Sequence, residues 1–220
     1  MTKLLHQAIG RLIVIDGIDQ SGKKTQTGLL VKRIRQQGFH CTRWDFPVYQ
    51  TTIGKRLKAY LGGMERPDLH VVHLLYAANK WEVARKIEDQ LRRGCIVVAN
   101  RYTPSNLVYG SAHGLSLDWL HALETGLPKP SCVIILDISI DTSFDRKNRS
   151  RDVHEKDLPY LERVRRSYIQ IGKKYRWKII DGGAAPEEVN SKIWKTVAPI
   201  LKSVRARRYK ARLFRLRDLA

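Results

Sequence analysis

Short apolar runs recur along the chain, and stretches with the period of amphipathic helices separate them. Four of the runs contain two or more Ile, Val or Leu residues and predict strands at 12–16, 95–99, 133–137 and 177–180, and the more polar segment 40–44 is predicted as a further strand. Continuous apolar runs of this length are typical of parallel strands that are buried on both faces. Strands that alternate with helices at this spacing predict a three-layer α/β/α fold with a five-stranded parallel sheet.

Start and stop signals place the helices between these strands. The predicted helices cover 23–37, 52–61, 68–93, a stretch ending near 125, 158–175 and a last segment from 186. Gly38, Gly62 and Gly94 follow three of them as C-terminal stops, and Asp68 is a plausible N-cap. A chain of 220 residues is long enough for one well-buried α/β domain, which we expect at 1–201, with a lid at about 146–157 and a basic helical tail at 202–220.

The loop after the first strand has the spacing of a phosphate-binding P-loop, G-x-x-x-x-G-K. Gly17 and Gly22 occupy the two glycine positions, and Lys23 follows them at the predicted start of a helix. Glycines let successive backbone N–H groups curl around a polyphosphate, and the helix N-terminus favours the same anion. The alternative is a glycine turn before an ordinary helix. The residues predicted to bind ATP here are Gly17, Ile18, Asp19, Gln20, Ser21, Gly22, Lys23, Lys24 and Thr25.

One position departs from this motif. After the lysine the motif has Ser or Thr, whose hydroxyl binds Mg²⁺, but this chain has Lys24, and Thr25 comes one residue later. One residue is about 100° of helix rotation, so Thr25 does not take over that position. Either the metal is held differently in this protein, or the second lysine partly replaces it.

The charge balance favours polyanionic ligands. The chain has 41 Lys and Arg against 21 Asp and Glu, a formal net charge of +20. The segment 202–220 alone has eight basic residues and one Asp. Nucleotides and nucleic acid both fit such a charge. The tail is either a basic helix docked on the domain or on a second subunit, or a contact site for nucleic acid or an acidic partner.

The cysteines indicate a reduced environment. Cys41, Cys95 and Cys132 each lie in or directly beside a predicted strand, without a C-x-x-C pair or a nearby pair of histidines. They predict buried thiols and argue against a disulfide framework or a zinc site. The sequence shows no signal-peptide pattern and no apolar run of transmembrane length, so we expect a cytoplasmic protein with no membrane contact.

In a parallel sheet, ligands bind beyond the carboxyl ends of the strands, so the residues after each strand are informative. Four motifs, spread over about residues 12–182, resemble those of thymidylate kinases in type and order. They are the P-loop, Phe46-Pro47, the helical run L-L-Y-A-A-N-K-W-E at 74–82, and N-R-Y-x-x-S at 100–105 followed by G-L-P-K-P at 126–130. The resemblance implies transfer of the terminal phosphoryl group of ATP to dTMP.

The resemblance also implies roles for individual residues. Asp19 matches the acid that accepts a hydrogen bond from the 3′-hydroxyl of the sugar, and Arg101 matches the arginine that grips the acceptor phosphate. Tyr76 matches the aromatic residue that stacks on the base, and Lys80 stands where an arginine usually reads a base carbonyl. The alternative for this pair is an amphipathic helix with Tyr76 in the core and Lys80 in water. The predicted substrate-binding residues are Asp19, Phe46, Pro47, Tyr76, Lys80, Arg101, Ser105 and Tyr109.

Phosphoryl transfer needs much positive charge held in line with the reacting groups. Members of the family whose P-loop lacks an arginine carry it in the lid, and here the P-loop position is Gln20. Arg146, Arg149 and Arg151 are therefore the candidate lid arginines, with a solvated basic turn as the alternative. The predicted catalytic residues are Lys23, Arg101, Arg149 and Arg151, and Arg146 is assigned to ATP binding.

The chain departs from the family pattern at three positions. Lys24 replaces a metal-binding hydroxyl, Asn100 replaces an aspartate that supports Mg²⁺, and Asp45 stands where an arginine often contacts the acceptor phosphate. We therefore expect Mg²⁺ to be held mainly through ATP oxygens and water, and we assign no residue as a metal ligand. Arg43 is a candidate to compensate for the arginine that Asp45 replaces.

Two other functions stay open from the sequence. One is a kinase for another pyrimidine deoxynucleotide on the same fold. The other is a nucleotide-binding relative without transfer activity, with a tail that binds nucleic acid. The family is commonly a homodimer packed through helices, so we also expect a homodimer, for which the long helix ending near 93 is a candidate surface.

Overall fold

The computed structural model describes residues 10–146 and 157–217, and describes 206–217 by their backbone alone. Five parallel strands form one sheet in the order β2-β3-β1-β4-β5. Their bounds are β1 Arg11–Asp16, β2 Cys41–Asp45, β3 Ile96–Asn100, β4 Cys132–Asp137 and β5 Lys178–Asp181. The predicted parallel α/β sheet is confirmed, and each strand lies within about two residues of its predicted range.

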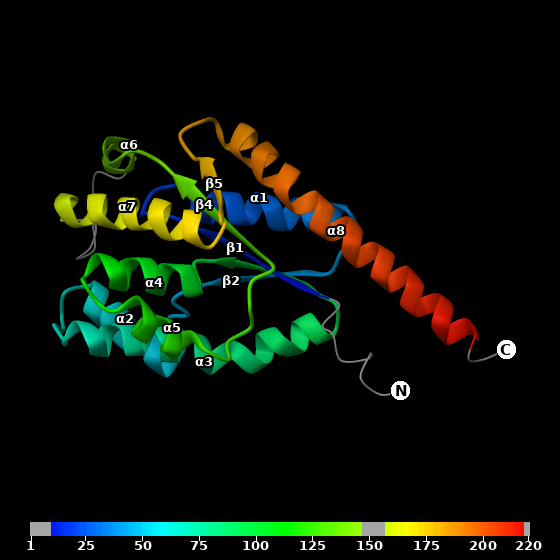
Figure 1. Ribbon diagram of the computed structural model, residues 1–220, viewed down its shortest axis with the longest axis horizontal. Coiled ribbons are helices and arrows are strands. Elements are labelled where there is room, and N and C mark those ends of the chain that lie inside the picture. Colours follow the sequence, from blue (N-terminus) through cyan, green and yellow to red (C-terminus); the bar gives the residue numbers. More distant parts are fainter. Residues whose placement is uncertain (1–9, 147–156, 218–220) are drawn as a thin grey trace.

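Helices cover both faces of the sheet (Figure 1). Their bounds are α1 Lys23–Gln36, α2 Thr52–Leu61, α3 Leu69–Arg92, α4 Thr103–Ala112, α5 Leu117–Glu124, α6 Ile140–Asp145, α7 Leu158–Lys174 and α8 Pro186–Arg217. Alternate residues of β1 face opposite layers: Ile13 and Ile15 pack with α1 and α8, whereas Leu12 and Val14 pack with α3. This two-sided burial explains why the central strands are apolar throughout.

Two helical details differ from the sequence prediction. The single stretch expected before residue 125 is two helices, because Gly114 takes a left-handed backbone with φ of 86° and Leu115 N–H bonds to the carbonyl of Gly110. The short helix α6 was not predicted. Ser139 caps it by accepting a hydrogen bond from the backbone N–H of Thr142, a signal that follows β4 directly.

The last helix runs through the expected start of the basic tail without a break. Val204 is fully buried in the core cluster between α1 and α8. Arg205 donates a hydrogen bond to the carbonyl of Gln37 and stacks over the ring of Phe39. The domain therefore includes α8 to at least residue 205, and in Figure 1 the rest of α8 extends away from the sheet toward the C-terminus.

The sheet order places the P-loop at its centre. β1 lies between β3 and β4, so the chain leaves β1 at the carboxyl edge where strand order reverses. Ligands of parallel sheets bind in the crevice at such a switch point. The residues that follow β1, β2, β3 and β4 therefore meet at one edge.

Candidate active site

The P-loop adopts a conformation that its glycines make possible. Gly17 has φ of 144°, and a Cβ atom there would lie 2.4 Å from the carbonyl oxygen of Leu136. Gly22, with φ of 87°, is the N-cap of α1. The ammonium group of Lys23 is buried, 2.5 Å from the carbonyl oxygen of Ile18 and 4.0 Å from Oδ1 of Asp19. The backbone turn and the lysine together form an anion-binding concavity at a helix N-terminus.

A pocket of about 600 Å³ opens over this loop, and we call it the donor pocket. Lys24 and Thr25 line it and are both exposed. Arg146 bridges its rim, with hydrogen bonds to the carbonyls of Gln20 and Gly182. Its lining residues are Asp19, Gln20, Ser21, Gly22, Lys23, Lys24, Thr25, Gln26, Asn100, Arg101, Arg146, Gly182, Ala184, Pro186 and Val189.

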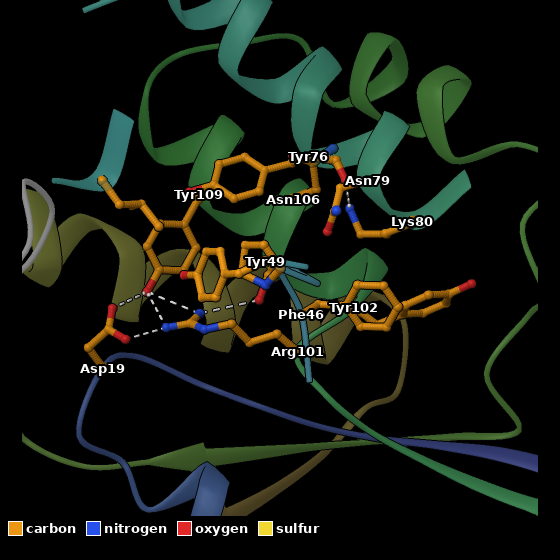
Figure 2. A pocket seen from close by; sticks show the side chains of 13 residues that line it. Asp19, Phe46, Tyr49, Tyr76, Asn79, Lys80, Arg101, Tyr102, Asn106 and Tyr109 are labelled. Atoms are coloured by element: carbon orange, nitrogen blue, oxygen red, sulfur yellow. Dashed lines mark hydrogen bonds and ion pairs between the residues drawn. The ribbon is translucent and has the colours of Figure 1, made fainter. Parts of the chain in front are cut away.

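A second pocket, which we call the acceptor pocket, lies beside the first and is shown in Figure 2. All eight residues predicted to bind the acceptor line it, although they come from the P-loop, the loop after β2, α3, the end of β3 and α4. Its lining residues are Asp19, Phe46, Pro47, Tyr49, Leu61, Tyr76, Asn79, Lys80, Arg101, Tyr102, Ser105, Asn106 and Tyr109. The structure therefore brings the predicted acceptor residues to one place.

Asp19 and Arg101 line both pockets and bind each other directly, in a cluster that includes Tyr109 (Figure 2). The hydroxyl of Tyr109 donates to Oδ2 of Asp19 at 2.9 Å. Burial alone would raise the pKa of Asp19, but the charges of Arg101 and Lys23 and these hydrogen bonds hold it well below its usual range. The carboxylate therefore stays ionised, an acceptor at the boundary of the two pockets.

A buried carboxylate, that of Asp16, lies close to the guanidinium of Arg101. Asp16 is fully buried and accepts hydrogen bonds from the hydroxyls of Ser105 and Tyr168 at 2.8 Å, and its Oδ1 lies 3.9 Å from Nη1 of Arg101. Arg101 itself has φ of 62°, which is uncommon for a residue with a side chain and clusters at functional sites. Ser105 thus lines the pocket with its hydroxyl committed to Asp16.

On the base side of the pocket, the structure excludes one of the two sequence interpretations of α3. Tyr76 is half-buried, but Lys80 is 3% exposed, and its ammonium donates to Oε1 of Glu124 at 2.9 Å and to the carbonyl of Tyr76. The alternative that placed Lys80 in water is wrong. A lysine can be buried here because Glu124, on α5, neutralises it.

The sequence reasoning missed five residues that line the acceptor pocket: Tyr49, Leu61, Asn79, Tyr102 and Asn106. The Asn79 amide accepts from Val48 N–H at 2.8 Å and so fixes the loop after Phe46-Pro47. Both asparagines lie within or directly after motifs that the sequence had singled out. Asn79 is only 1% exposed and Asn106 only 2%. The sequence did not show this burial, which would have singled them out.

The ends of β2 and β3, where Asp45 and Asn100 depart from the family pattern, form a separate hydrogen-bond network. Arg43 binds both carboxylate oxygens of Asp45 at 2.7 Å, and the amide of Asn100 donates to Oδ1 of Asp45 at 2.8 Å. The carboxylate of Asp45 points to these two partners. The guanidinium of Arg43 is thus committed to Asp45, and the structure gives no support for its compensating role at the acceptor phosphate.

The polar groups at the donor pocket fit a Mg²⁺ ion held through phosphate oxygens. Among residues 10–146 and 157–217, no group of three His, Cys, Asp or Glu side chains could hold a metal alone. The Oδ1 atom of Asn100 is buried without a hydrogen-bond partner, so one neutral oxygen is left over at this edge. Mg²⁺ commonly uses few protein ligands together with phosphates and waters.

The candidate lid arginines Arg149 and Arg151 lie outside the described residues. The three cysteines are free thiols, with Cys41 and Cys95 buried and Cys132 half-buried. No helix in the described part of the chain is both long and apolar enough to span a bilayer.

Comparisons with known proteins agree with this geometry. The family model for thymidylate kinase matches residues 15–193. Curated thymidylate kinases are similar to the chain: the protein of Arabidopsis thaliana is 35% identical over 193 residues, 88% of this chain and 73% of its own. The human protein is 34% identical over 187 residues, 84% of this chain and 88% of its own.

A solved structure of thymidylate kinase from Candida albicans superposes with a TM-score of 0.79 at 27% identity, covering 89% of this chain and 93% of that one. The family match includes the P-loop, the residues that line both pockets and, of the sheet, everything except the first four residues of β1. The chain therefore belongs to the thymidylate kinase family.

Proposed function

We propose that this protein transfers the terminal phosphoryl group of ATP to dTMP, giving dTDP and ADP. The observation that carries the proposal is that the donor and acceptor pockets meet at Asp19 and Arg101. A polyphosphate on the P-loop and a nucleotide in the acceptor pocket would place their phosphates on either side of this pair. The family membership of the chain supports the same reaction.

In this reaction an oxygen of the dTMP phosphate attacks the terminal phosphorus of ATP, the bond to the bridging oxygen breaks, and ADP leaves. Lys23 and the P-loop N–H groups bind the donor phosphates. The guanidinium of Arg101 holds the acceptor phosphate, and Asp19 keeps that guanidinium in place and accepts from the sugar hydroxyl. Because such transfer needs little covalent help, positioning and positive charge supply most of the catalysis. Arg146, Arg149 and Arg151 add charge from the lid side.

Mg²⁺ belongs to the proposal as the cofactor. When bound, it would neutralise the charge of the donor phosphates. Thr25 is exposed in the donor pocket, and its hydroxyl would be within the reach of the water shell of the ion. The ammonium of Lys24 adds a second fixed charge beside the same phosphates.

A coupled assay with ATP, Mg²⁺ and dTMP tests the proposal. The wild-type protein should form ADP, and a Lys23→Ala variant, with the donor lysine removed, should not. ADP formation no faster than in that variant would refute the kinase activity. A panel of dTMP, dUMP, UMP, CMP and thymidine separates this kinase from one for another pyrimidine nucleotide. Nucleotide binding without turnover would instead indicate a non-catalytic relative.

The proposal includes a homodimer. Val71, Leu74 and Trp81 are each nearly half exposed, and their spacing places them on one face of α3. An exposed apolar stripe on a long helix fits an interface with a second copy. A Leu74→Glu variant should elute from size-exclusion chromatography as a monomer, whereas the wild-type protein and a Glu82→Gln variant should elute as dimers. A monomeric wild-type protein would refute the dimer.

The proposal also includes a polyanion site along α1 and α8. These helices pack together, and α1 has five basic and no acidic residues, whereas 189–217 of α8 has ten basic and no acidic residues. On α8 the described apolar side chains, such as Ile193 and Val197, face the core. The partner that we propose for this basic surface is nucleic acid, whose phosphates are bound by Lys and Arg side chains.

Truncation after residue 201 would remove the buried Val204, so substitution is the cleaner test. Changing Lys195, Lys202 and Arg205 to Gln should lower DNA affinity, and the logarithmic salt slope should fall by about one for each lost phosphate contact. The kinase rate should not change. Salt-independent or absent DNA binding by the wild-type protein would refute the site, and binding to anionic vesicles instead would redirect it to a membrane.

A cytoplasmic location completes the proposal. The free thiols of Cys41, Cys95 and Cys132 are typical of a reducing compartment. Cell fractionation with an antibody to the protein tests this, and a signal confined to an organelle would contradict it.

A further inference from the structure

A chain of buried polar side chains lies behind the base side of the acceptor pocket. Its members are Glu124 at the end of α5, Lys80 and His73 on α3, and Asn106 on α4, each at most 8% exposed. Lys80 and Asn106 also line the pocket, whereas Glu124 and His73 do not. Glu124 and His73 therefore influence which hydrogen-bonding atoms of Lys80 and Asn106 face a ligand in the pocket.

Glu124 is the member on which the others converge. Its Oε1 atom accepts a hydrogen bond from Nζ of Lys80 at 2.9 Å and from Nδ2 of Asn106 at 2.7 Å. A carboxylate at the C-terminal end of a helix is opposed by the helix dipole, and a buried ion pair contributes little net stability. The position of Glu124 is fixed by Trp81, whose indole N–H bonds to the carbonyl of Leu123 next to it. Fold stability alone gives a weak reason for an acid here.

The carboxylate determines which way the amide of Asn106 points. Because an ionised carboxylate only accepts hydrogen bonds, Nδ2 of Asn106 must face Glu124, and Oδ1 must face Nδ1 of His73, 2.7 Å away. Burial lowers the pKa of His73 to about 4, so its ring is neutral at pH 7 and carries its proton on Nδ1. Its Nε2 atom then accepts from His113 at 3.2 Å. The orientation of each group follows from Glu124.

Few hydrogen-bonding positions are left for a ligand. Both Nδ2 hydrogens of Asn106 are used, by Glu124 and by the carbonyl of His73, so its amide offers only the second lone pair of Oδ1. Lys80 uses two of its three N–H groups, on Glu124 and on the carbonyl of Tyr76, and offers the third. Lys80 and Asn106 together thus present one donor near one acceptor.

This pair complements a pyrimidine that has a carbonyl at C4 and N–H at N3. A 4-aminopyrimidine presents the reverse order, an amino donor at C4 and an acceptor at N3, and would leave buried groups unpaired. We propose that Glu124 is a positioning residue that sets the hydrogen-bond polarity of the acceptor pocket, so that it accepts 4-keto pyrimidine nucleotides and rejects 4-amino ones. This inference rests on the proposed function, since it places the base in this pocket.

The test uses two ligands that differ only at C4, dTMP and 5-methyl-dCMP. For the wild-type protein, kcat/KM and the calorimetric Kd should both favour dTMP by at least about 100-fold, because unpaired buried groups are costly. In Glu124→Gln the new amide can donate or accept, so the amide of Asn106 is free to turn. The preference should fall by about 10-fold or more. KM should change more than kcat, since Glu124 does not touch the reacting atoms.

Three further variants separate positioning from folding. Glu124→Asp keeps an acceptor-only carboxylate and should keep the preference. Asn106→Ala removes the acceptor but leaves the Lys80–Glu124 pair, so it decides the question if Glu124→Gln does not fold. Glu162→Gln changes a glutamate on α7 whose side chain is 42% exposed, and it should not change the preference. The preference is a ratio within one preparation, so it does not depend on the folded fraction.

The outcomes are distinct. Wild-type protein that turns over or binds both nucleotides equally, or a preference that survives both Glu124→Gln and Asn106→Ala, overturns the inference. Wild-type protein that binds dTMP selectively without forming ADP overturns the proposed reaction but supports the inference. Loss of preference in both variants, with retention in Glu124→Asp, supports it.

Discussion

Asn100→Asp should destabilise the protein, although aspartate is the residue that the family usually has at this position. In the structure the Asn100 amide donates to Oδ1 of Asp45 at 2.8 Å. The variant loses this hydrogen bond, at about 1 kcal/mol, and sets two carboxylates side by side. At about 3 Å, two unit charges repel by about 1.4 kcal/mol in the dielectric of water, which is appropriate because the side chain of Asp45 is 48% exposed. The free energy of unfolding should fall by about 1–3 kcal/mol at pH 7.

Urea denaturation of a double-mutant cycle measures this effect. Asp45→Asn in the Asn100→Asp background restores a carboxylate–amide pair with reversed polarity and should recover most of the loss. The penalty should be full at pH 7, where both carboxylates are ionised, and should shrink as the pH falls toward 4, because protonation of either acid removes the repulsion. Additive effects in the cycle, or an Asn100→Asp variant as stable as wild type, would refute this account.

The contact between Asn100 and Asp45 also limits how the residues that usually support Mg²⁺ can be restored. Lys24→Thr with Asn100→Asp returns both metal-supporting residues, but Asp45 then competes electrostatically with the new acid. We expect the lowest Mg²⁺ requirement for half-maximal rate when Asp45→Asn is added to these two changes. Titration of the rate with Mg²⁺ compares the variants, and a triple variant with the wild-type requirement would show that this edge does not support the metal.

Other predictions concern the core, the P-loop and the acceptor arginine. Burial lowers the pKa of His73 from 6.5 to about 4 in the folded protein. As the pH falls, the unfolded protein therefore binds a proton at this residue before the folded protein does. Up to about 3 kcal/mol of the free energy of unfolding should be lost between pH 6.5 and 4. Denaturation across this range should show a flatter profile for His73→Gln, and equal profiles would contradict the shift. Gly17→Ala forces a Cβ to within 2.4 Å of a carbonyl oxygen, so its melting temperature should fall by several degrees, whereas Gly28→Ala, whose Cβ has room in α1, should not lower it. Arg101→Lys removes the planar fork and should lower kcat/KM for dTMP by about 100-fold or more, with a smaller effect on ATP affinity; a fall of less than tenfold would argue against a direct phosphate contact.

Much of the molecule could be predicted from its sequence. The strands, most of the helices and the P-loop follow from signals within about ten residues: apolar runs, helix caps, and glycines where the backbone turns. The acceptor residues could be named before their distances were known because their motifs resemble those of thymidylate kinases. Parallel strand order explains why the motifs after β1, β2 and β3 meet at one edge. The split of α4 from α5 was missed because the helical pattern continues on both sides of Gly114.

Tertiary structure decided what each polar side chain binds. Asp45 and Asn100 are 55 residues apart, and so are unrelated in any local pattern, yet they pair across β2 and β3. Lys80 looked like a solvated lysine or a base reader, and only the packing of α5 on α3 showed that Glu124 buries and neutralises it. The sequence by itself determined the sheet, the P-loop and the family motifs, because these depend on local periodicity and spacing. The partners of charged and amide groups were determined by tertiary structure, because they depend on burial and on contacts between distant segments.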